Sequence, residues 1–257
     1  MTLAYLGTAF AGWQRQPGVS TVQGTMEAAL ARLFGSPVTV TAAGRTDAGV
    51  HAAGQVAHAD LPVTIPGDGL RAAMAGALPP EVRVVRAGRV SPEFHALRDA
   101  RGKRYVYRFL WKAPRLPWSG LRSAVARPPA DRAAMAKAAA LFRGRLDVAS
   151  FTVPDHGRAG TVRTIRRFEL RFRPAGLTVT VEGDGFLRYQ VRRMVGLLME
   201  VGWGRRSVAD VARFLDDPEP GRAVWTAPGR GLTLERVFYG AAAPGAAGAV
   251  VDFGAQG

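Results

Sequence analysis

Cysteine is absent from this chain of 257 residues. Without thiols the protein cannot have a disulfide framework, a thiolate nucleophile, an iron–sulfur cluster or a common type of structural zinc site. The lack of thiols fits a reducing compartment, so we expect a cytoplasmic protein. Long hydrophobic runs are also missing, because a charged residue interrupts every stretch that approaches the roughly 18 apolar residues of a membrane span. We therefore expect no association with a membrane.

The apolar opening MTLAYLGTAFAGW resembles a secretory signal only in its hydropathy. No basic residue precedes it, and Gln14 and Arg15 follow it directly. A signal peptide needs a basic start and a longer apolar core. We expect a first strand and a turn here.

Motifs for common cofactors are missing too. The sequence has no G-x-x-x-x-G-K-[ST] phosphate loop and no H-E-x-x-H zinc motif. The histidines lie too far apart in sequence to form a local ligand pair, although the first two could meet across a hairpin: His51, His58, His95 and His156. A lone histidine near a strand is more often a hydrogen-bonded structural residue. We expect no metal and no small-molecule cofactor.

Acidic residues are few. Asp and Glu number 20 against 35 Lys and Arg, which gives a formal net charge of +15. On a folded protein of 27.4 kDa, this charge favours a polyanionic partner, because each neutralised phosphate releases counterions. Almost all the basic residues are arginine, so a genome rich in G and C is an alternative explanation. Nucleic acid is the partner that the charge favours.

The length allows one large domain or two small ones, and 47% hydrophobic residues are enough for a buried core. The periodicity predicts a β-α-β-β-α-β order in the first half, with strands at 1–6, 38–43, 55–61 and 82–87 and helices at 21–34 and 66–78. Thr21 or Ser20 is expected to cap the first helix, and Gly35 to end it.

A similar order recurs in the second half. Strands are expected at 104–111, 162–172, 177–182 and 232–239, and helices at 131–142, 187–201 and 207–215, with a hairpin turn at 174–176. We predict an α+β fold of two ferredoxin-like halves, 1–100 and 101–240, joined into a mostly antiparallel sheet with helices on one side and a basic cleft on the other. The remaining residues, 241–257, are expected to be a low-complexity tail.

One segment concentrates residues that suit chemistry. In the stretch AGRTDAGVH at 43–51, two glycines bracket Arg45 and Asp47 between two predicted strands. Glycines in such a loop let the backbone turn sharply and let a planar ligand approach, so that Asp47 would be held rigidly. Taken alone, however, Asp47 is more often a turn aspartate bonded to its own backbone.

Five blocks of this sequence together resemble one enzyme family. The octet GRTDAGVH is preceded by GWQRQ at 12–16 and followed by FHA at 94–96, KRYVY at 103–107 and VRRMVGLLMEVG at 191–202. In order and approximate spacing, from residue 4 to about residue 240, they are similar to the tRNA pseudouridine synthase A family. The octet is a highly specific motif, and the resemblance covers nearly the whole chain.

The resemblance implies a function and a set of site residues. Uridines 38, 39 and 40 of the tRNA anticodon stem-loop would be isomerised to pseudouridine by a homodimer that contacts one tRNA with both subunits. Asp47 matches the family's catalytic aspartate and Arg192 the arginine that pairs with it, while Tyr105 matches the tyrosine that stacks on the target base. Arg45 matches an arginine that helps expose the target nucleotide, and Arg104 and Arg188 are expected to contact the RNA.

The chemistry of such an isomerisation fits what the sequence offers. It needs a nucleophile and confinement of the freed uracil, but neither a metal nor a redox group. A carboxylate in a dry cleft also needs a cation to stay ionised. With a helix from Leu187, Arg188 and Arg192 would lie at the edge of its apolar arc, and Arg193 would point away. Without the resemblance, Arg192 would be a solvated helix residue and Tyr105 a half-buried strand aromatic.

Three positions depart from the family's pattern. Leu6 stands where relatives commonly have Asp, Leu97 stands where FHA is commonly followed by Arg, and the chain begins several residues later than usual. Leu97 removes one candidate RNA contact, for which Arg98 and Arg101 could compensate. Two other functions stay open: a pseudouridine synthase that acts on another RNA, and a non-catalytic RNA-binding module of the same fold.

Overall fold

The structure is a computed structural model that describes residues 1–116, 118–155, 157, 160–223 and 225–240. It divides into two compact units, Met1–Arg101 together with the chain from Leu234, and Gly102–Thr233. The expectation that the last strand belongs to the second half was wrong: most of this strand groups with the first unit, in which it pairs with one of that unit's strands. The expected tail, 241–257, lies outside the described residues. No helix in the described part of the chain is long and apolar enough to cross a membrane.

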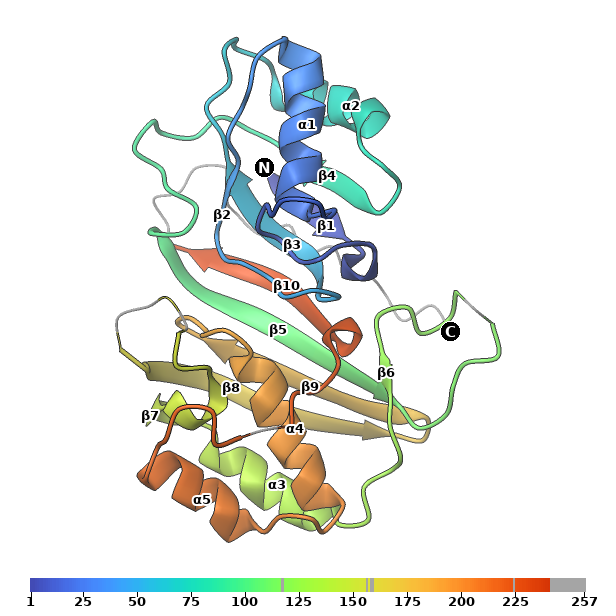
Figure 1. The fold of residues 1–257 in the computed structure, drawn as a ribbon, viewed down its shortest axis with the longest axis vertical. Helices are drawn as coiled ribbons and strands as arrows, with labels where there is room; N and C mark the ends of the chain where they lie inside the picture. Colours follow the sequence, from blue (N-terminus) through green and yellow to red (C-terminus); the bar gives the residue numbers. More distant parts are fainter. Residues whose placement is uncertain (117, 156, 158–159, 224, 241–257) are drawn as a thin grey trace. The chain divides into compact units, whose positions relative to one another are not determined.

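The first unit has a sheet with the strand order β4-β1-β3-β10 and a short strand β2 paired to β3. β1 is antiparallel to both β3 and β4, and the helices α1 and α2 pack against each other beside these strands (Figure 1). The bounds are β1 (Thr2–Tyr5), α1 (Val22–Phe34), β2 (Thr41–Ala42), β3 (His51–His58), α2 (Gly67–Ala77), β4 (Val82–Arg86) and β10 (Leu232–Tyr239), with a short 3-10 helix at Gly7–Ala9.

Local signals place the first helix where the sequence predicts it. The Thr21 hydroxyl accepts a hydrogen bond from the backbone N–H of Gly24 at 3.3 Å, and Gly35 has a φ of 71°, which ends α1. The strand expected at 38–43 is limited to β2, and β3 starts at His51 instead of residue 55. β3 starts early because Ala52 already pairs with Tyr5 of β1. The chain therefore enters the sheet with the last residue of the octet, His51.

The second unit has the strand order β5-β9-β8-β7, all antiparallel, and β6 pairs in parallel with β5. The helix α3 packs against α4, α5 and β8, so the helices of this unit gather on one face of its strands (Figure 1). The bounds are β5 (Ala100–Leu110), β6 (Ala124–Val125), α3 (Arg132–Leu141), β7 (Gly144–Asp147), β8 (Val162–Arg173), β9 (Gly176–Gly183), α4 (Gln190–Gly202) and α5 (Val208–Asp216), with 3-10 helices at Ala149–Phe151 and Gly229–Gly231.

Most of the predicted elements of the second unit are confirmed. The β8–β9 hairpin turns where expected, with Arg173 opposite Gly176, and the Asp131 carboxylate caps α3. Two boundaries were wrong. β5 begins at Ala100 and not at residue 104. α4 begins at Gln190 and not at Leu187, because Tyr189 adopts a left-handed conformation with a φ of 64°. Arg188 therefore lies before the helix and not on it. The α+β class with mainly antiparallel strands is confirmed.

A continuous set of hydrogen bonds links α1 to the octet. The carbonyls of Gly12 and Trp13 accept from the N–H groups of Val22 and Gln23, two of the donors that the start of a helix leaves unpaired. The N–H of Trp13 in turn donates to the carbonyl of Thr46 at 3.0 Å. The start of α1 thus fixes the segment 12–13, and this segment fixes the octet.

The closeness of this contact requires glycine at position 12. Gly12 has a φ of 102°, and a Cβ there would lie 2.8 Å from the Thr46 carbonyl oxygen. A side chain would therefore meet both a strained backbone conformation and a steric clash with backbone that cannot turn away.

We expect Gly12→Ala to lower the free energy of unfolding by about 2–3 kcal/mol, measured by urea denaturation. Gly18→Ala is the matched control, since Gly18 also has a positive φ, of 74°, but a Cβ added there would have no other atom within 4 Å. The control should lose only the conformational part, about 1 kcal/mol. Equal losses for the two variants would contradict the steric contact.

Candidate active site

Asp47 lies at the first position of a tight turn. Its carbonyl accepts from the N–H of Val50 at 3.1 Å, and Gly49, at the third position, has a φ of 77°. A type II turn requires this positive φ, which glycine adopts without strain. The Asp47 residue itself is partly exposed. The turn therefore gives Asp47 a fixed backbone position and leaves part of the residue exposed.

Buried polar groups hold the turn from its other side. The Tyr5 phenol and the Thr46 hydroxyl are hydrogen-bonded at 2.9 Å, and the Gln55 amide donates to the Gly44 carbonyl at 2.8 Å. Burial raises the pKa of Tyr5 to about 12, so its hydroxyl keeps its proton at neutral pH. Sequence reasoning missed Tyr5 and Gln55, because only the strand pairing brings them under the loop.

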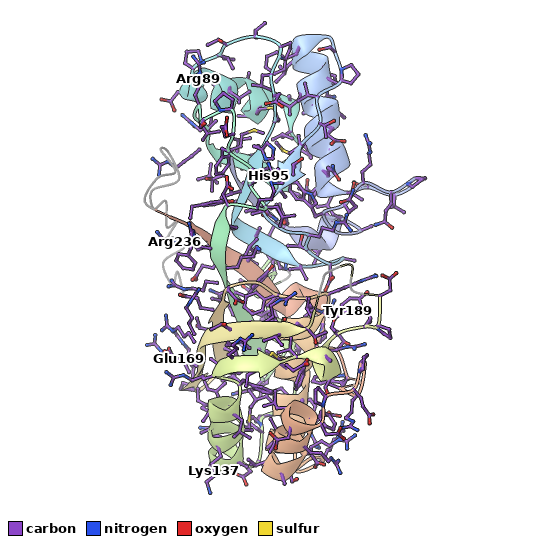
Figure 2. All side chains as sticks on the ribbon, turned by 90° about the vertical axis from the view of Figure 1, so that its left-hand side faces the viewer. Arg89, His95, Lys137, Glu169, Tyr189 and Arg236 are labelled. Carbon is purple, nitrogen blue, oxygen red and sulfur yellow. The ribbon has the colours of Figure 1, made fainter. Side chains whose placement is uncertain are left out.

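Three of the histidines, His51, His58 and His95, lie among the described residues. His51 is fully buried, and its Nδ1 accepts from the N–H of Gly7 at 3.1 Å. The proposed meeting of His51 and His58 across a hairpin was wrong, because both lie on β3. The His58 ring instead lies 4.9 Å from the ring of His95 (Figure 2 labels His95), and burial, helped by the charge of His95, lowers the pKa of His58.

Arg45, next to Asp47 in the octet, is exposed. Arg104 lies on β5 opposite Glu182 of β9, and its guanidinium forms an ion pair with that carboxylate at 2.9 Å. Both side chains are mostly buried, with exposed fractions of 26% and 19%. Arg45 thus has access to a ligand, whereas a contact from Arg104 to RNA would draw on a guanidinium that already binds Glu182.

Tyr105 is more buried than a half-buried strand aromatic, with 7% of its surface exposed. Its ring meets the ring of Phe186 edge-on, with centroids 5.3 Å apart. Tyr107 lies two residues further on the same face of β5, is fully buried, and donates from its hydroxyl to the Pro228 carbonyl at 2.7 Å. Burial raises the pKa of Tyr107. Tyr107 is therefore a structural residue, and Tyr105 is the aromatic with some surface left.

Arg192 lies in the first turn of α4 and is partly buried. Its Nε donates to the Ala227 carbonyl at 2.7 Å, and the N–H of Ala227 donates back to the Arg192 carbonyl at 3.2 Å. The guanidinium is therefore positioned by the segment that precedes β10. Arg192 is therefore not the solvated helix residue that would be expected without the family resemblance.

Tyr189, directly before α4, gathers three guanidinium groups around its ring (Figure 2 labels Tyr189). Those of Arg188, Arg192 and Arg193 lie 4.9, 5.4 and 5.8 Å from the ring centroid. The expectation that Arg193 points away was wrong: its Nη1 donates to the Thr152 carbonyl at 2.6 Å, and burial lowers its pKa. Among the described residues, Tyr189 is the only non-glycine residue with a positive φ.

This clustering explains why such a strained conformation is kept. A bulky residue in the left-handed region costs free energy and persists where its surroundings fix it. Here the π-face of Tyr189 attracts cations that would otherwise repel one another. Sequence reasoning missed Tyr189, because its conformation and its neighbours arise only from the packing at the start of α4.

The structure thus places the candidate residues in two groups. Arg45 and Asp47 belong to the first unit, and Arg104, Tyr105, Arg188 and Arg192 to the second. Among the described residues, no group of three or more His, Asp or Glu side chains could hold a metal ion.

Substitution of Tyr189 tests whether its ring holds the arginines. Tyr189→Phe keeps the ring and loses only the hydroxyl that accepts from Arg188, so we expect a loss of well under about 1 kcal/mol. Tyr189→Leu keeps the strain but removes three cation–π contacts, and should cost about 1–2 kcal/mol more than the Phe variant. Urea denaturation measures both, and equal stability of the Phe and Leu variants would show that the ring holds nothing.

Comparison with known proteins identifies the family. Residues 1–96 and 138–240 match the model of a family described as tRNA pseudouridine synthase. A tRNA pseudouridine synthase A of Myxococcus xanthus is 42% identical over 240 residues, which cover 93% of this chain and 91% of that protein. Those of Solidesulfovibrio magneticus and Frankia casuarinae are 44% and 43% identical, covering 96% and 93% of this chain and 92% and 88% of theirs. The chain therefore belongs to the tRNA pseudouridine synthase family.

Proposed function

We propose that this enzyme isomerises uridine to pseudouridine at positions 38, 39 and 40 of the tRNA anticodon stem-loop, with Asp47 as the nucleophile. The observation that carries the proposal is the position of Asp47. Asp47 is the first residue of a turn whose backbone is hydrogen-bonded at Thr46 and at Val50, and the residue is partly exposed. A nucleophile must be held close to its reacting position, and a fixed backbone provides this.

The reaction exchanges one bond for another. The bond between N1 of uracil and C1′ of ribose breaks, the freed base turns, and a bond from C5 to C1′ forms. The proton on C5 leaves and N1 gains one, so atoms balance and no oxidant is consumed. Asp47 attacks either C1′ of the sugar or the base ring, and in both routes the covalent adduct with the carboxylate later breaks.

The other site residues have roles that follow from their chemistry. Tyr105 provides an aromatic surface for the uracil, and its side-chain oxygen would, as the phenolate, accept the C5 proton. Arg192 supplies the cation that keeps a confined carboxylate ionised. Arg45, Arg104 and Arg188 contact RNA phosphates or help to expose the target nucleotide, and recognition by shape and phosphate suits an enzyme that modifies adjacent positions in many tRNAs.

We also propose that the enzyme acts in the cytoplasm as a homodimer, with a basic cleft that receives the anticodon stem-loop. The net charge of +15 supports a polyanionic substrate. A synthase that acts on another RNA would leave these tRNA positions unmodified, and a non-catalytic module would bind tRNA without changing it.

Release of tritium from tRNA labelled at C5 of uridine tests the catalytic role of Asp47. Asp47→Asn should reduce the release at least about a thousandfold, because the amide is a poor nucleophile, while affinity for tRNA stays within a few-fold. Asp68→Asn is the control, since the Asp68 carboxylate is 96% exposed on α2. Residual release above a tenth of the wild-type rate would remove Asp47 from the nucleophilic role.

A double-mutant cycle tests the proposed pairing of Arg192 with Asp47. Arg192→Met loses the hydrogen bond to Ala227 in any background, so only the difference between backgrounds reports the pair. In the wild-type background the substitution should cost at least about 1 kcal/mol more stability than in Asp47→Asn, where the carboxylate charge is already gone. Equal costs measured by urea denaturation would show that the two side chains do not interact.

A further inference from the structure

The second unit contains a hollow that none of the site residues lines. Its volume is about 380 Å³, and its walls include Phe109, Arg127, Trp203, Arg205, Trp225 and Pro228. No acidic residue lines it. A volume at the low end of the range for small-ligand pockets suits one nucleotide and not a folded partner.

Two indoles form the aromatic wall. The rings of Trp203 and Trp225 have centroids 5.3 Å apart and planes tilted by 56°. Trp203 is fixed, because its Nε1 donates to the Arg127 carbonyl at 3.1 Å. Trp225 packs on α4 at Gly196, where a Cβ would lie 3.0 Å from the Cε3 atom of the indole. The wall is therefore rigid before any ligand arrives, which lowers the entropic cost of binding.

Two cations stand at the same indole. The guanidinium groups of Arg127 and Arg205 lie 5.4 and 5.1 Å from the centroid of Trp203. Both residues are exposed, and among the described residues neither has an ion-pair partner. Their charges are available to an anion. Rigid indoles beside available guanidinium groups are the combination that binds a base by stacking and its phosphate by charge.

We propose that this hollow, the Trp203–Trp225 pocket, binds an unpaired nucleotide of the RNA substrate other than the uridine that is isomerised. The proposal rests on the tRNA substrate proposed above. The bound nucleotide is distinct from the target because none of Asp47, Tyr105 and Arg192 lines the pocket. The pocket is nevertheless tied to the site through the segment 225–228, since Ala227 holds Arg192 and Pro228 holds Tyr107.

Separate measurements of tRNA affinity and of kcat distinguish a role of the pocket in binding from a role in catalysis. Trp203→Leu should weaken tRNA binding about tenfold in a filter assay, as expected for one lost stacking contact, and leave kcat at saturating tRNA within about twofold. Trp203→Phe should recover most of the affinity. The control Trp118→Leu removes a tryptophan that is 68% exposed and does not line the pocket, and should leave the affinity unchanged.

The two arginines are tested by salt dependence. The double variant Arg127→Gln/Arg205→Gln should reduce the slope of log Kd against log salt concentration by about one to two, because up to two phosphate contacts are lost. Arg71→Gln/Arg83→Gln removes the same charge from two residues of the first unit that do not line the pocket, and controls for the change in net charge.

Crosslinking locates the nucleotide directly. Irradiation of tRNA that contains 4-thiouridine should join it to the peptide that carries Trp203 or Trp225, at a nucleotide outside positions 38–40.

Unchanged tRNA affinity in a folded Trp203→Leu variant would overturn the proposal. If that variant does not fold, the absence of such a crosslink to the wild-type protein would overturn it. Altered molar mass in light scattering with unaltered tRNA affinity would assign the pocket to contact between copies of the chain. These assays measure binding and not catalysis. A wild-type protein that forms no pseudouridine would contradict the proposed function without affecting the test of the pocket.

Discussion

The close backbone contact between Gly12 and the octet is the constraint on which the first unit's site depends. The contact works because residue 12 has no Cβ that would press on the Thr46 carbonyl. On one side the segment 12–13 accepts hydrogen bonds from two of the unpaired N–H groups at the start of α1, and on the other it donates one to the Thr46 carbonyl. The backbone of Asp47, the next residue, is therefore held in a fixed position. The N-terminus of α1 thus helps to fix the backbone that carries the Asp47 carboxylate.

The second unit solves a different problem, which is to hold several like charges close together. Arg192 is bonded to the Ala227 carbonyl and Arg193 to the Thr152 carbonyl, so each guanidinium is directed by a backbone oxygen. The ring of Tyr189 lies among them, in a conformation that is costly for a tyrosine. This arrangement concentrates positive charge at the start of α4, although the conformation of Tyr189 costs free energy. Such a concentration suits a phosphate-rich substrate.

Elements governed by neighbouring residues could be predicted from the sequence. Thr21 and Gly35 bound α1, Asp131 caps α3, and the β8–β9 hairpin turns at 174–176, because caps and turns depend on a few adjacent residues. The start of α4 could not be predicted, since a tyrosine in the left-handed region has no local cause. The early start of β3 likewise depends on its pairing with β1.

Some site residues could likewise be predicted from a local motif, and others depend on the fold. The octet pointed to Asp47 because its motif is specific, and the structure adds that the turn at Gly49 presents it. Residues that support it, such as Tyr5 and Gln55, carry no motif and are brought there by strand register alone. The Trp203–Trp225 pair was equally invisible, because the two indoles are distant in sequence and meet only through the packing on α4.

The most direct measurement of the central claim is a map of pseudouridine, at nucleotide resolution, in the RNA of cells that lack this chain. The account predicts that pseudouridine disappears from positions 38, 39 and 40 of tRNA and returns when the wild-type chain is supplied, but not when the Asp47→Asn chain is supplied at equal abundance. Persistence of pseudouridine at these positions in the deletion strain, or its return with Asp47→Asn, would contradict the account.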